Sequence, residues 1–417
     1  MDRCMGYAVE HATEVERQKV EVRQSRTDYR TALLDFLPSI GAQLSGQYSW
    51  GRNIDPETNT YNNVTTFNNY WQLSASMPVF DGGRTIAAFR QARTAKGNAL
   101  NALQKARDEK AIAVMGKFVD ATYAEKSVEL ARQKLDDARQ LLKKTRTLYE
   151  LGEKSWPDVV QIESQVAEDD YNLLHQQNLA RQTLLELKRE MNFPTDGTLR
   201  VDTVINEARP ASMDNGEQLF SLYGEQSVDV RAAQGTAENA RFNWIMARAS
   251  LMPSLNLGAA IATNYYKNLS ADGFHETFNR QFRNNMGEYF YLTLSIPVFA
   301  PSQWRLTKRA RANYKLAQIG LEETRRKLHD DILMAVMDRD GYCKEVEQMK
   351  RKVEADNMAY LLSTRKYEEG LLSVFDLQTV AQTLMESRIK LLQLQLMLTM
   401  KQKLVEYYKG EPLWTLK

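Results

Sequence analysis

The chain contains one internal duplication, in which a pattern of segments returns after about 218 residues, and this feature constrains its fold most strongly. Two glycine turns match best, because 149–158 (YELGEKSWPD) and 367–376 (YEEGLLSVFD) share tyrosine, glutamate, glycine, serine and aspartate. Two shorter motifs recur in the same order, with LPS at 37–39 returning as MPS at 252–254, and MPVF at 77–80 returning as IPVF at 296–299. The sequence therefore predicts two structural repeats, 1–209 and 210–417.

Net charge and hydropathy exclude several classes of protein. Lys and Arg total 55 against 53 Asp and Glu, giving a formal charge of +2, so nucleic acid is not an expected partner. No apolar run approaches the ~18 residues that a membrane-spanning helix needs. Any membrane-spanning part must therefore be built from strands.

The residue types that carry metal, redox or catalytic chemistry are few and scattered. Cys4 and Cys343 form neither a CxxC motif nor a disulfide framework. The histidines show no metal-ligand spacing; they are His11, His175, His275 and His329. No glycine-rich phosphate loop or nucleophile elbow occurs. We therefore expect no enzymatic activity, no metal and no cofactor.

Proline placement marks two long segments that can form uninterrupted helices. None of the 10 prolines falls between Pro78 and Pro157 or between Pro301 and Pro412, and a proline inside a helix costs ~3 kcal/mol. Apolar residues recur there every seven positions, as in coiled coils; examples are Ala121, Val128, Leu135, Leu142 and Tyr149, and later Leu377, Leu384, Leu391, Leu398 and Val405. We expect two antiparallel coiled-coil hairpins, about 84–192 and 303–409.

Each hairpin turn has residues suited to ending one helix and beginning the next. Glycine adopts the left-handed conformation of a helix C-cap. Serine caps the N-terminus of the returning helix, and an acid three residues later completes a capping box. These residues are Gly152, Ser155 and Asp158 in the first turn, and Gly370, Ser373 and Asp376 in the second.

Helix lengths indicate where a linker belongs. At 1.5 Å per residue, a helix over 84–148 spans ~98 Å, whereas its return over 156–192 covers ~55 Å and a further helix over 216–250 covers ~50 Å. Two short helices placed end to end therefore match one long helix. We expect residues 195–215 to form a belt around the middle of this helical rod.

Four other segments alternate apolar or small residues with polar ones, at 40–50, 71–79, 255–261 and 290–298. This period of two predicts strands of roughly ten residues, the length of transmembrane barrel strands, in hairpins of about 39–80 and 254–299. The alternative is two soluble hairpins packed on a core, but paired helices offer no broad apolar surface to cover them. A barrel needs about eight strands, so several chains must share one barrel.

With these features the chain resembles, over essentially its whole length, the TolC-type outer-membrane efflux proteins (OEP). The resemblance is carried by the duplicated LPS and MPS strand starts, by PVFDGG at 78–83 and by the duplicated Tyr-Glu-x-Gly turns; the second repeat departs at Ala300-Pro301, where Asp-Gly-Gly is missing. It implies a mixed, mostly α fold with internal duplication. The helical hairpins would form an α-barrel, and each chain would add four strands to a transmembrane β-barrel.

The resemblance also implies a homotrimer in the outer membrane of a Gram-negative bacterium, in contact with outer-membrane lipid and extending into the periplasm. Its function would be a passive exit duct of a tripartite efflux pump or type I secretion system. Its partners would be a periplasmic adaptor (membrane fusion) protein and an inner-membrane transporter. Because a signal peptide normally precedes this family's first helix, we interpret the start at Met1 as trimmed or misassigned, and Cys4 as an ordinary helix residue rather than a lipid anchor.

A gate just after the second turn is a further implication of the resemblance, which predicts a ring of aspartates there. Asp376 matches the first aspartate of the ring, whereas Thr379 stands at the position of the second. A ring with one carboxylate per subunit predicts weaker cation selectivity. An equal interpretation is that Asp376 is only the capping acid of its helix, and one carboxylate can serve both roles.

The two turns are candidate contacts for the tip of an adaptor's helical hairpin, again by resemblance. The candidate residues are Tyr149, Gly152, Ser155, Asp158, Tyr367, Gly370 and Ser373. Helix capping by itself also explains the two glycines.

Aromatic residues at strand positions suit a girdle at the bilayer boundary, with ordinary strand packing as the alternative; they are Tyr48, Trp50, Tyr70, Trp71 and Phe290. The strand connections, about 51–69 and 265–287, are expected to face the outside of the cell. We interpret Arg280 and Arg283 there as solvated loop charge rather than as ligands of lipopolysaccharide phosphates.

A soluble or periplasmic coiled-coil scaffold or adaptor protein is the alternative function, because it too would contain long heptad hairpins. It does not explain four alternating strands.

Overall fold

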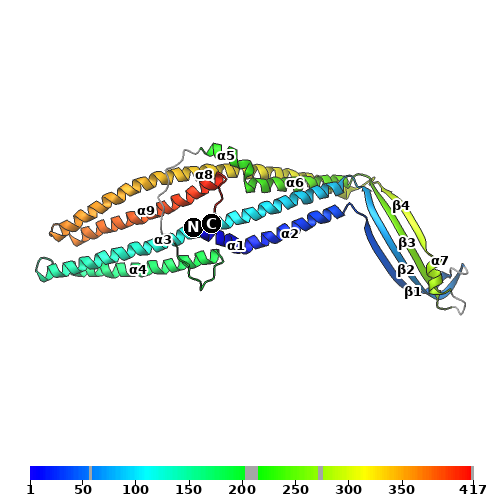
Figure 1. Ribbon diagram of the computed structural model, residues 1–417, viewed down its shortest axis with the longest axis horizontal. Coiled ribbons are helices and arrows are strands. Elements are labelled where there is room, and N and C mark those ends of the chain that lie inside the picture. The colour runs from blue at the N-terminus through cyan, green and yellow to red at the C-terminus, as the bar shows by residue number, and fades with distance from the viewer. Residues whose placement is uncertain (56–58, 202–214, 271–275, 415–417) are drawn as a thin grey trace. The chain divides into compact units, whose positions relative to one another are not determined.

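The computed structural model describes residues 1–55, 59–201, 215–270 and 276–414, and within them the chain is mostly helical with one antiparallel sheet (Figure 1). The mixed, mostly α fold predicted from the sequence is confirmed. Most of the expected belt at 195–215, parts of both expected strand connections, and His275 lie outside the described residues.

The chain divides into two compact units, each assembled from separate stretches of sequence. The first unit comprises 1–21, 100–232 and 322–417, and the second comprises 22–99 and 233–321. Four helices contribute residues to both units: α2 (Thr13–Leu34), α3 (Arg84–Glu150), α6 (Val228–Ala249) and α8 (Pro301–Glu368).

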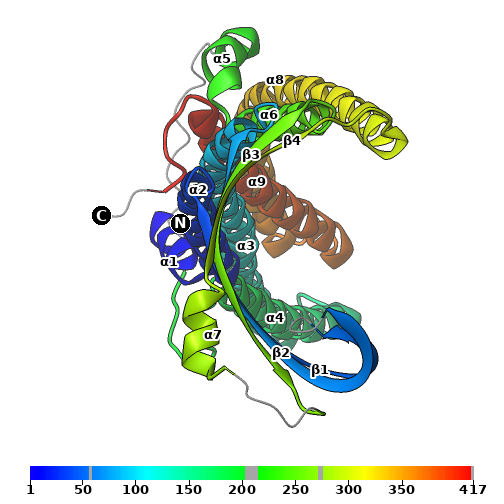
Figure 2. The ribbon, with the colours of Figure 1, turned by 90° about the vertical axis from the view of Figure 1, so that its right-hand side faces the viewer.

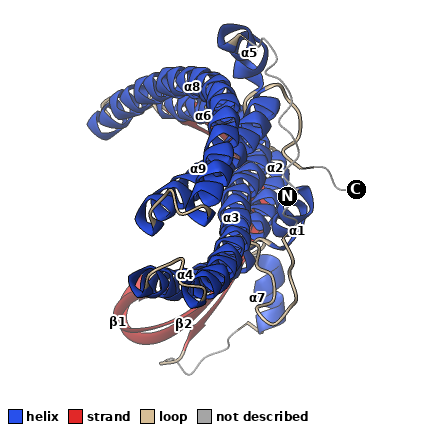
Figure 3. Cartoon of the chain, turned by 90° about the vertical axis from the view of Figure 1, so that its left-hand side faces the viewer, coloured by secondary structure: helices blue, strands red, loops and turns tan. Residues whose placement is uncertain are grey.

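Two long helical hairpins build the first unit. The later part of α3 turns back into α4 (Trp156–Glu190), and the later part of α8 turns back into α9 (Val374–Tyr408) (Figure 3). The seven-residue pattern is the reason they pair, because its members are largely buried: Ala121, Val128 and Leu135 on α3, and Leu377, Leu384, Leu398 and Val405 on α9. Each fully buried leucine contributes about 1.5–3 kcal/mol.

A further cluster of buried side chains lies in the first unit near the C-terminal end of α4. Helix α1 (Asp2–His11) places Met5 and Ala8 against Val114 and Met115 of α3 and against Leu187 of α4. All five side chains have no exposed surface. The N-terminal helix is therefore an integral part of this unit.

The helix expected over 216–250 is interrupted, which corrects the sequence interpretation. It consists of α5 (Gly216–Tyr223), a 3-10 turn η1 (Gly224–Gln226) and then α6. Ser227 takes an extended backbone (φ −54°, ψ 137°) between them. A single residue outside the helical region is enough to start a new helix, and Asp229 then supplies the acid of its first turn.

A four-stranded antiparallel sheet in the order β1-β2-β3-β4 dominates the second unit; the strands are β1 (Ser39–Asp55), β2 (Thr60–Phe80), β3 (Ser254–Asn268) and β4 (Gly287–Ser295). The estimate of roughly ten residues per strand is too short for three of them. Pairing of β1 with β2 continues to Asp55↔Thr60, so most of the connection expected at 51–69 is strand. Asn and Thr residues weaken the alternation of apolar and polar residues in this part of β2. The strand forms nevertheless, because pairing with β1 provides hydrogen-bond partners for its backbone amides and carbonyls.

The register keeps the predicted apolar face together across the sheet. Leu44 pairs with Trp71, Leu73 with Ile261, and Leu257 with Leu292, and cross-strand partners share a face. Tyr70 is different, because it pairs with Ser45 and with Asn264 on the opposite, polar face. It therefore cannot share a girdle surface with its neighbour Trp71.

A short helix, α7 (Phe278–Asn284), lies against the sheet and was not predicted (Figure 2). Strand β4 ends its pairing at Ala262, so the next part of the β3 edge lacks a strand partner. The Gln281 side chain accepts from the Tyr266 amide and donates to the Tyr266 carbonyl, both at 2.9 Å, and Asn285 donates to the Asn264 carbonyl at 2.8 Å. Side-chain amides thus replace a strand along this edge.

Candidate functional site

The candidate site lies at the two hairpin turns and in the space between the hairpins, all within the first unit. At each turn the glycine has a positive φ, +80° at Gly152 and +74° at Gly370. The Glu153 amide donates to the Leu148 carbonyl, and the Leu371 amide donates to the Lys366 carbonyl, both at 2.8 Å. These bonds define a Schellman motif at each turn, which confirms the predicted glycine caps.

The predicted serine caps are also formed, and both aspartates take part. The Ser155 amide donates to the Asp158 carboxylate at 3.0 Å, and the Ser155 hydroxyl donates to it at 2.7 Å. In the second turn, Ser373 accepts from the Asp376 amide at 3.1 Å and its hydroxyl donates to the Asp376 carboxylate at 2.7 Å. Both carboxylates therefore lie at a helix N-terminus, where negative charge is stabilised.

Lys154 of the first turn contacts the end of α8, joining the two hairpins. Its ammonium donates to the Tyr367 carbonyl at 2.9 Å and lies 4.0 Å from the centroid of the Tyr367 ring. Beside it, the hydroxyls of Thr145 and Tyr367 lie 2.9 Å apart, and Lys144 pairs with Glu368 at 2.6 Å. A cation at the C-terminus of a helix is favoured by the helix dipole.

The two repeats differ at their equivalent tyrosines. Tyr367 is 1% exposed, whereas Tyr149 is 42% exposed and its ring packs against Trp156. Burial also raises the pKa of the Tyr367 hydroxyl, so it stays protonated and available to Thr145. Sequence reasoning missed Lys154, although a signal existed: the equivalent position in the second repeat is Leu372, so a cation appears in only one copy.

An open hollow of about 620 Å³ lies at the turns, and most of the predicted tip residues line it. Six of the seven predicted residues line it, namely Gly152, Ser155, Asp158, Tyr367, Gly370 and Ser373. Tyr149 does not belong to this lining. The surface has donors and acceptors from both hairpins, which suits recognition of a protein segment through polar contacts.

The two predicted gate residues lie one turn apart at the start of α9. Asp376 is exposed and bonded to Ser373, while the Thr379 hydroxyl donates to the Phe375 carbonyl at 3.0 Å. Of these two residues, Thr379 also lines a second cavity, which lies between the hairpins.

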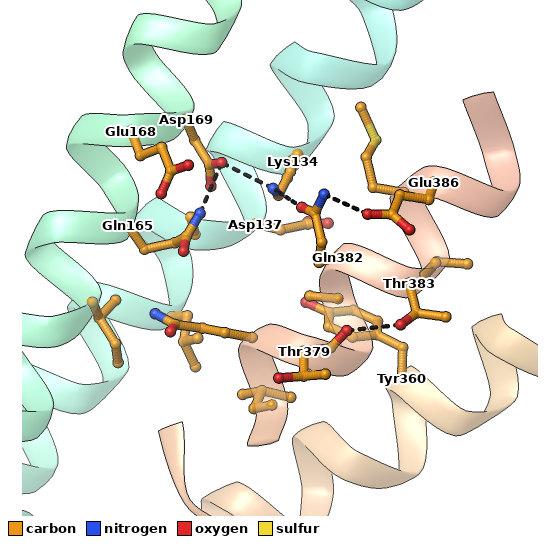
Figure 4. A pocket seen from close by; sticks show the side chains of 18 of the residues that line it. Lys134, Asp137, Gln165, Glu168, Asp169, Tyr360, Thr379, Gln382, Thr383 and Glu386 are labelled. Atoms are coloured by element: carbon orange, nitrogen blue, oxygen red, sulfur yellow. Dashed lines mark hydrogen bonds and ion pairs between the residues drawn. The ribbon is translucent and has the colours of Figure 1, made fainter. Parts of the chain in front are cut away.

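That cavity, about 480 Å³, is lined by residues of α3, α4, α8 and α9 (Figure 4). Lys134 of α3 lies between two partners, pairing with Asp169 of α4 at 3.1 Å and donating to Gln382 of α9 at 2.9 Å. Gln382 in turn donates to Glu386 at 3.0 Å. Burial raises the pKa of Asp137 at the same cavity.

The predicted girdle residues of the second unit are dispersed over the sheet. Trp50 and Phe290 are 75% and 77% exposed, and the Tyr48 ring lies near those of Trp50 and Phe67. Trp71 is half-buried because Phe282 of α7 packs edge-on against it at 5.9 Å. Arg280, on α7, pairs with Glu276 at 3.0 Å.

In the described part of the chain, the side chains that can bind a metal ion are scattered. Its residues contain no group of three or more metal-ligating side chains. Among its helices, none combines the length and apolarity needed to cross a bilayer.

Two long helical hairpins and a four-stranded antiparallel sheet with one apolar face define a mostly helical, internally duplicated class of fold. The pattern described as "Outer membrane efflux protein" matches residues 6–192 and 219–405, one segment for each repeat. The chain therefore belongs to the outer membrane efflux protein family.

Individual relatives agree with this assignment. The chain is 25% identical over 415 residues to the pyoverdine export outer membrane protein OpmQ of Pseudomonas aeruginosa, covering 94% of this chain and 81% of the relative. Its fold is similar to that of VceC from Vibrio cholerae, with a TM-score of 0.84, 16% identity and coverage of 99% and 96%. It is also similar to CusC, with a TM-score of 0.82, 16% identity and coverage of 98% and 92%.

Proposed function

We propose that this chain is the passive exit duct of a tripartite efflux pump or type I secretion system, and that it has no catalytic centre. The observation that carries the proposal is the family match in both repeats, together with a sheet whose apolar face is exposed. A coiled-coil scaffold or adaptor is less well supported, because it gives the sheet no role.

The sheet supports assembly of a shared barrel from several copies. The described residues of each chain form a sheet of four strands with β1 and β4 as its edges, whereas a closed barrel needs about eight strands or more. Three chains give twelve strands and leave no edge unpaired, which removes the hazard of an open sheet edge in lipid. We therefore propose a homotrimer in the outer membrane.

The exposed apolar face of the sheet is long enough to span the apolar part of a bilayer, from Ile40 to Trp50 along β1. Phe290 lies on the same rung as Ala259, Ala75 and Ile40, whereas Trp50 lies ten residues beyond Ile40 along β1. Ten residues of antiparallel strand span ~34 Å. With strands tilted at about 40°, Ile40 and Trp50 of β1 differ in height by roughly 26 Å, close to the ~25 Å apolar band of outer-membrane barrels.

The hollow at the turns is the proposed docking site for a periplasmic adaptor that links the duct to an inner-membrane transporter. Gly370 tests this role, because a Cβ there would meet no neighbour within 4 Å while the positive φ must be kept. Gly370→Asn tolerates the left-handed conformation with a small side chain, whereas Gly370→Trp adds bulk. We expect the Asn variant to export normally and the Trp variant to assemble normally but lose export. Normal export by the Trp variant would contradict docking at this turn.

We further propose that Asp376 and Thr379 lie at the periplasmic constriction, with the carboxylate attracting cations. Reconstitution of the full chain in planar bilayers tests both the duct and its gate. We expect discrete conductance steps, a lower cation preference in Asp376→Asn and a higher one in Thr379→Asp. Asp158→Asn is the matched control, because Asp158 has the same capping role in the other repeat. An absence of conductance would overturn the duct, and equal selectivity in all variants would remove Asp376 from the gate.

A further inference from the structure

Two long helices begin directly after strands of the sheet and carry the same surface pattern. Strand β2 ends at Phe80 and α3 begins at Arg84, while β4 ends at Ser295 and α8 begins at Pro301. Near its start each helix has an exposed apolar side chain, followed by exposed cations four and seven residues later. We call these sets the basic stripes; they are Ile86, Arg90 and Arg93 on α3, and Trp304, Lys308 and Arg311 on α8.

The two basic stripes are equivalent in the internal duplication. Each residue of the second stripe follows its counterpart in the first by 218 residues, as Trp304 follows Ile86. The pattern therefore belongs to the repeat and not to one helix alone.

No carboxylate accompanies these cations in the sequence. Residues 84–99 contain four Lys and Arg and no Asp or Glu, and residues 301–321 contain five Lys and Arg and no Asp or Glu. The four stripe cations form no ion pair with another described residue. Exposed cations without counter-charges produce a positive potential that attracts anionic groups.

Both basic stripes lie on one side of the helical layer. Helix α6 lies between α3 and α8 in the second unit (Figures 1 and 2). Gln91 and Thr94 of α3 donate hydrogen bonds to side chains of α6 at 2.9 and 3.3 Å, and Tyr314 of α8 stacks on Trp244 of α6 with ring centroids 6.0 Å apart. At about 100° per residue, each stripe lies roughly a quarter turn from these contacts, in opposite rotational senses on the two helices. Because α6 is on opposite sides of α3 and α8, opposite rotations bring both stripes to the same side.

In the proposed duct, on which this step rests, the sheet spans the outer membrane and the helices enter the periplasm. Ile86 and Trp304, 50% and 47% exposed, then lie at the periplasmic end of the strands, where the hydrocarbon meets the headgroups. The cations of each stripe lie ~6 and ~10 Å further along the helix. A headgroup layer is about 5–8 Å thick, and long Lys and Arg side chains extend toward it.

We propose that the basic stripes bind the headgroups of anionic phospholipids in the leaflet that faces the periplasm. The cations contact the lipid phosphates, while Ile86 and Trp304 pack against the upper part of the acyl chains. A free anion matches this surface less well, because it has no use for the exposed apolar side chain that begins each stripe. Lipid held at both helix starts fixes the depth of the duct in the membrane.

The test titrates the full chain in detergent with dioleoyl phosphatidylglycerol and counts the bound lipids by native mass spectrometry. Dioleoyl phosphatidylcholine is the zwitterionic control, and glycerol 3-phosphate carries the phosphate without acyl chains. We expect phosphatidylglycerol to bind at least about tenfold more tightly than either control. Equal affinity for the two lipids would overturn the proposal. Glycerol 3-phosphate that binds as tightly as phosphatidylglycerol would show a site for free anions and would also overturn it.

Charge-removing variants locate the bound lipid. Lys308→Gln with Arg311→Gln, or Arg90→Gln with Arg93→Gln, should each lose about half of the bound phosphatidylglycerol, and all four substitutions together should abolish the preference over phosphatidylcholine. The matched control is Arg326→Gln with Lys327→Gln, which removes two exposed cations of α8 that lie ~25 Å beyond the stripe. A full preference in the four-substitution variant, or an equal loss in the control, would refute the stripes as the lipid site.

Conductance in planar bilayers separates this proposal from the duct itself. The four-substitution variant should keep the ion selectivity of the wild type, because the stripes face lipid. Altered selectivity would place the stripes inside the conduit and overturn lipid binding there. An absence of conductance in the wild type would instead contradict the duct, whereas the lipid titration is read independently of it.

Discussion

Tyr149 and Tyr367 occupy equivalent positions in the duplicated turns, yet their surroundings differ. Only Tyr367 is enclosed, by Thr145 at its hydroxyl and by Lys154 at its ring and carbonyl. The contacts join segments more than 200 residues apart. The duplication therefore supplied two similar turns, and the tyrosine of one of them takes part in attaching the hairpins to each other.

Tyr367→Phe should lower the free energy of unfolding by about 1 kcal/mol, because it leaves the buried Thr145 hydroxyl without its partner. Adding Thr145→Val should restore part of the loss, since both polar partners are then gone. Urea denaturation of the purified chain measures both effects. Tyr149→Phe is the matched control and should change stability by less than ~0.5 kcal/mol. An equal loss in both tyrosine variants would contradict the assigned role of Tyr367.

Local sequence patterns predicted the residues of the turns but not the link between them. Gly152, Ser155 and Asp158 act within a few positions of one another, so their spacing alone indicates the caps. The contact of Lys154 with Tyr367 depends on how two hairpins pack, for which no local pattern exists. The burial of the Asp169 Oδ2 atom without a hydrogen-bond partner among the described residues could not be predicted from the sequence either.

At the scale of elements, α5 is held on α8 by a titratable contact. His329 lies 3.2 Å from the Glu217 carboxylate and 3.4 Å from Asp330, and the Phe220 ring stands edge-on to its imidazole. Hydrogen bonds to Glu217 and then to Asp330 raise the pKa of His329 above its usual 6.5. The charged imidazole therefore stabilises this contact fully below pH 6.5, and the contribution is lost as pH rises through the higher folded value.

The amides of Gly216–Tyr223 should accordingly lose protection against hydrogen exchange as pH rises through the folded pKa of His329. Their exchange rate should rise by more than the intrinsic rate of an unstructured peptide rises over the same pH range. His329→Gln should remove this extra dependence, because glutamine does not titrate. His175→Gln is a control histidine on α4. Retention of the full pH dependence in His329→Gln would show that another group controls α5.

The edge of β3 gives a second prediction at the scale of elements. Gln281→Ala removes both hydrogen bonds to Tyr266, so the attachment of α7 should weaken by about 1–3 kcal/mol. Trypsin should then cut faster at Arg280 and Arg283. Asn279→Ala, an exposed change in the same helix, should be cut at the wild-type rate. Equal cutting of the two variants would show that Gln281 does not hold α7.

The type of an element was predictable where a periodic pattern continued over many residues. The ends of the strands were predicted wrongly where hydrogen bonding to a neighbouring strand determines them. Seven-residue repeats indicated the hairpins of α3 with α4 and of α8 with α9. The polar half of β2 has too little alternation to identify it as strand, and it forms because β1 and β3 pair with it. Helix α7 is short and depends on contacts with the sheet, so no sequence period marks it.

At the scale of the whole molecule, the duplication links sequence to function. Within the described residues, each repeat contributes one helical hairpin and two strands to the fold, and the family pattern covers both copies. Both outer strands of the sheet remain available as edges within one chain. A closed membrane-spanning structure therefore requires other copies of the chain.

The direct test of that requirement is fractionation of cells that express the chain, followed by electrophoresis with and without heating. We predict that the protein occurs in the outer-membrane fraction and migrates, unheated, at about three times the 47.9 kDa mass of one chain. Heating should convert this band to the mass of a single chain. A soluble protein that migrates as one chain before heating would contradict the proposed duct.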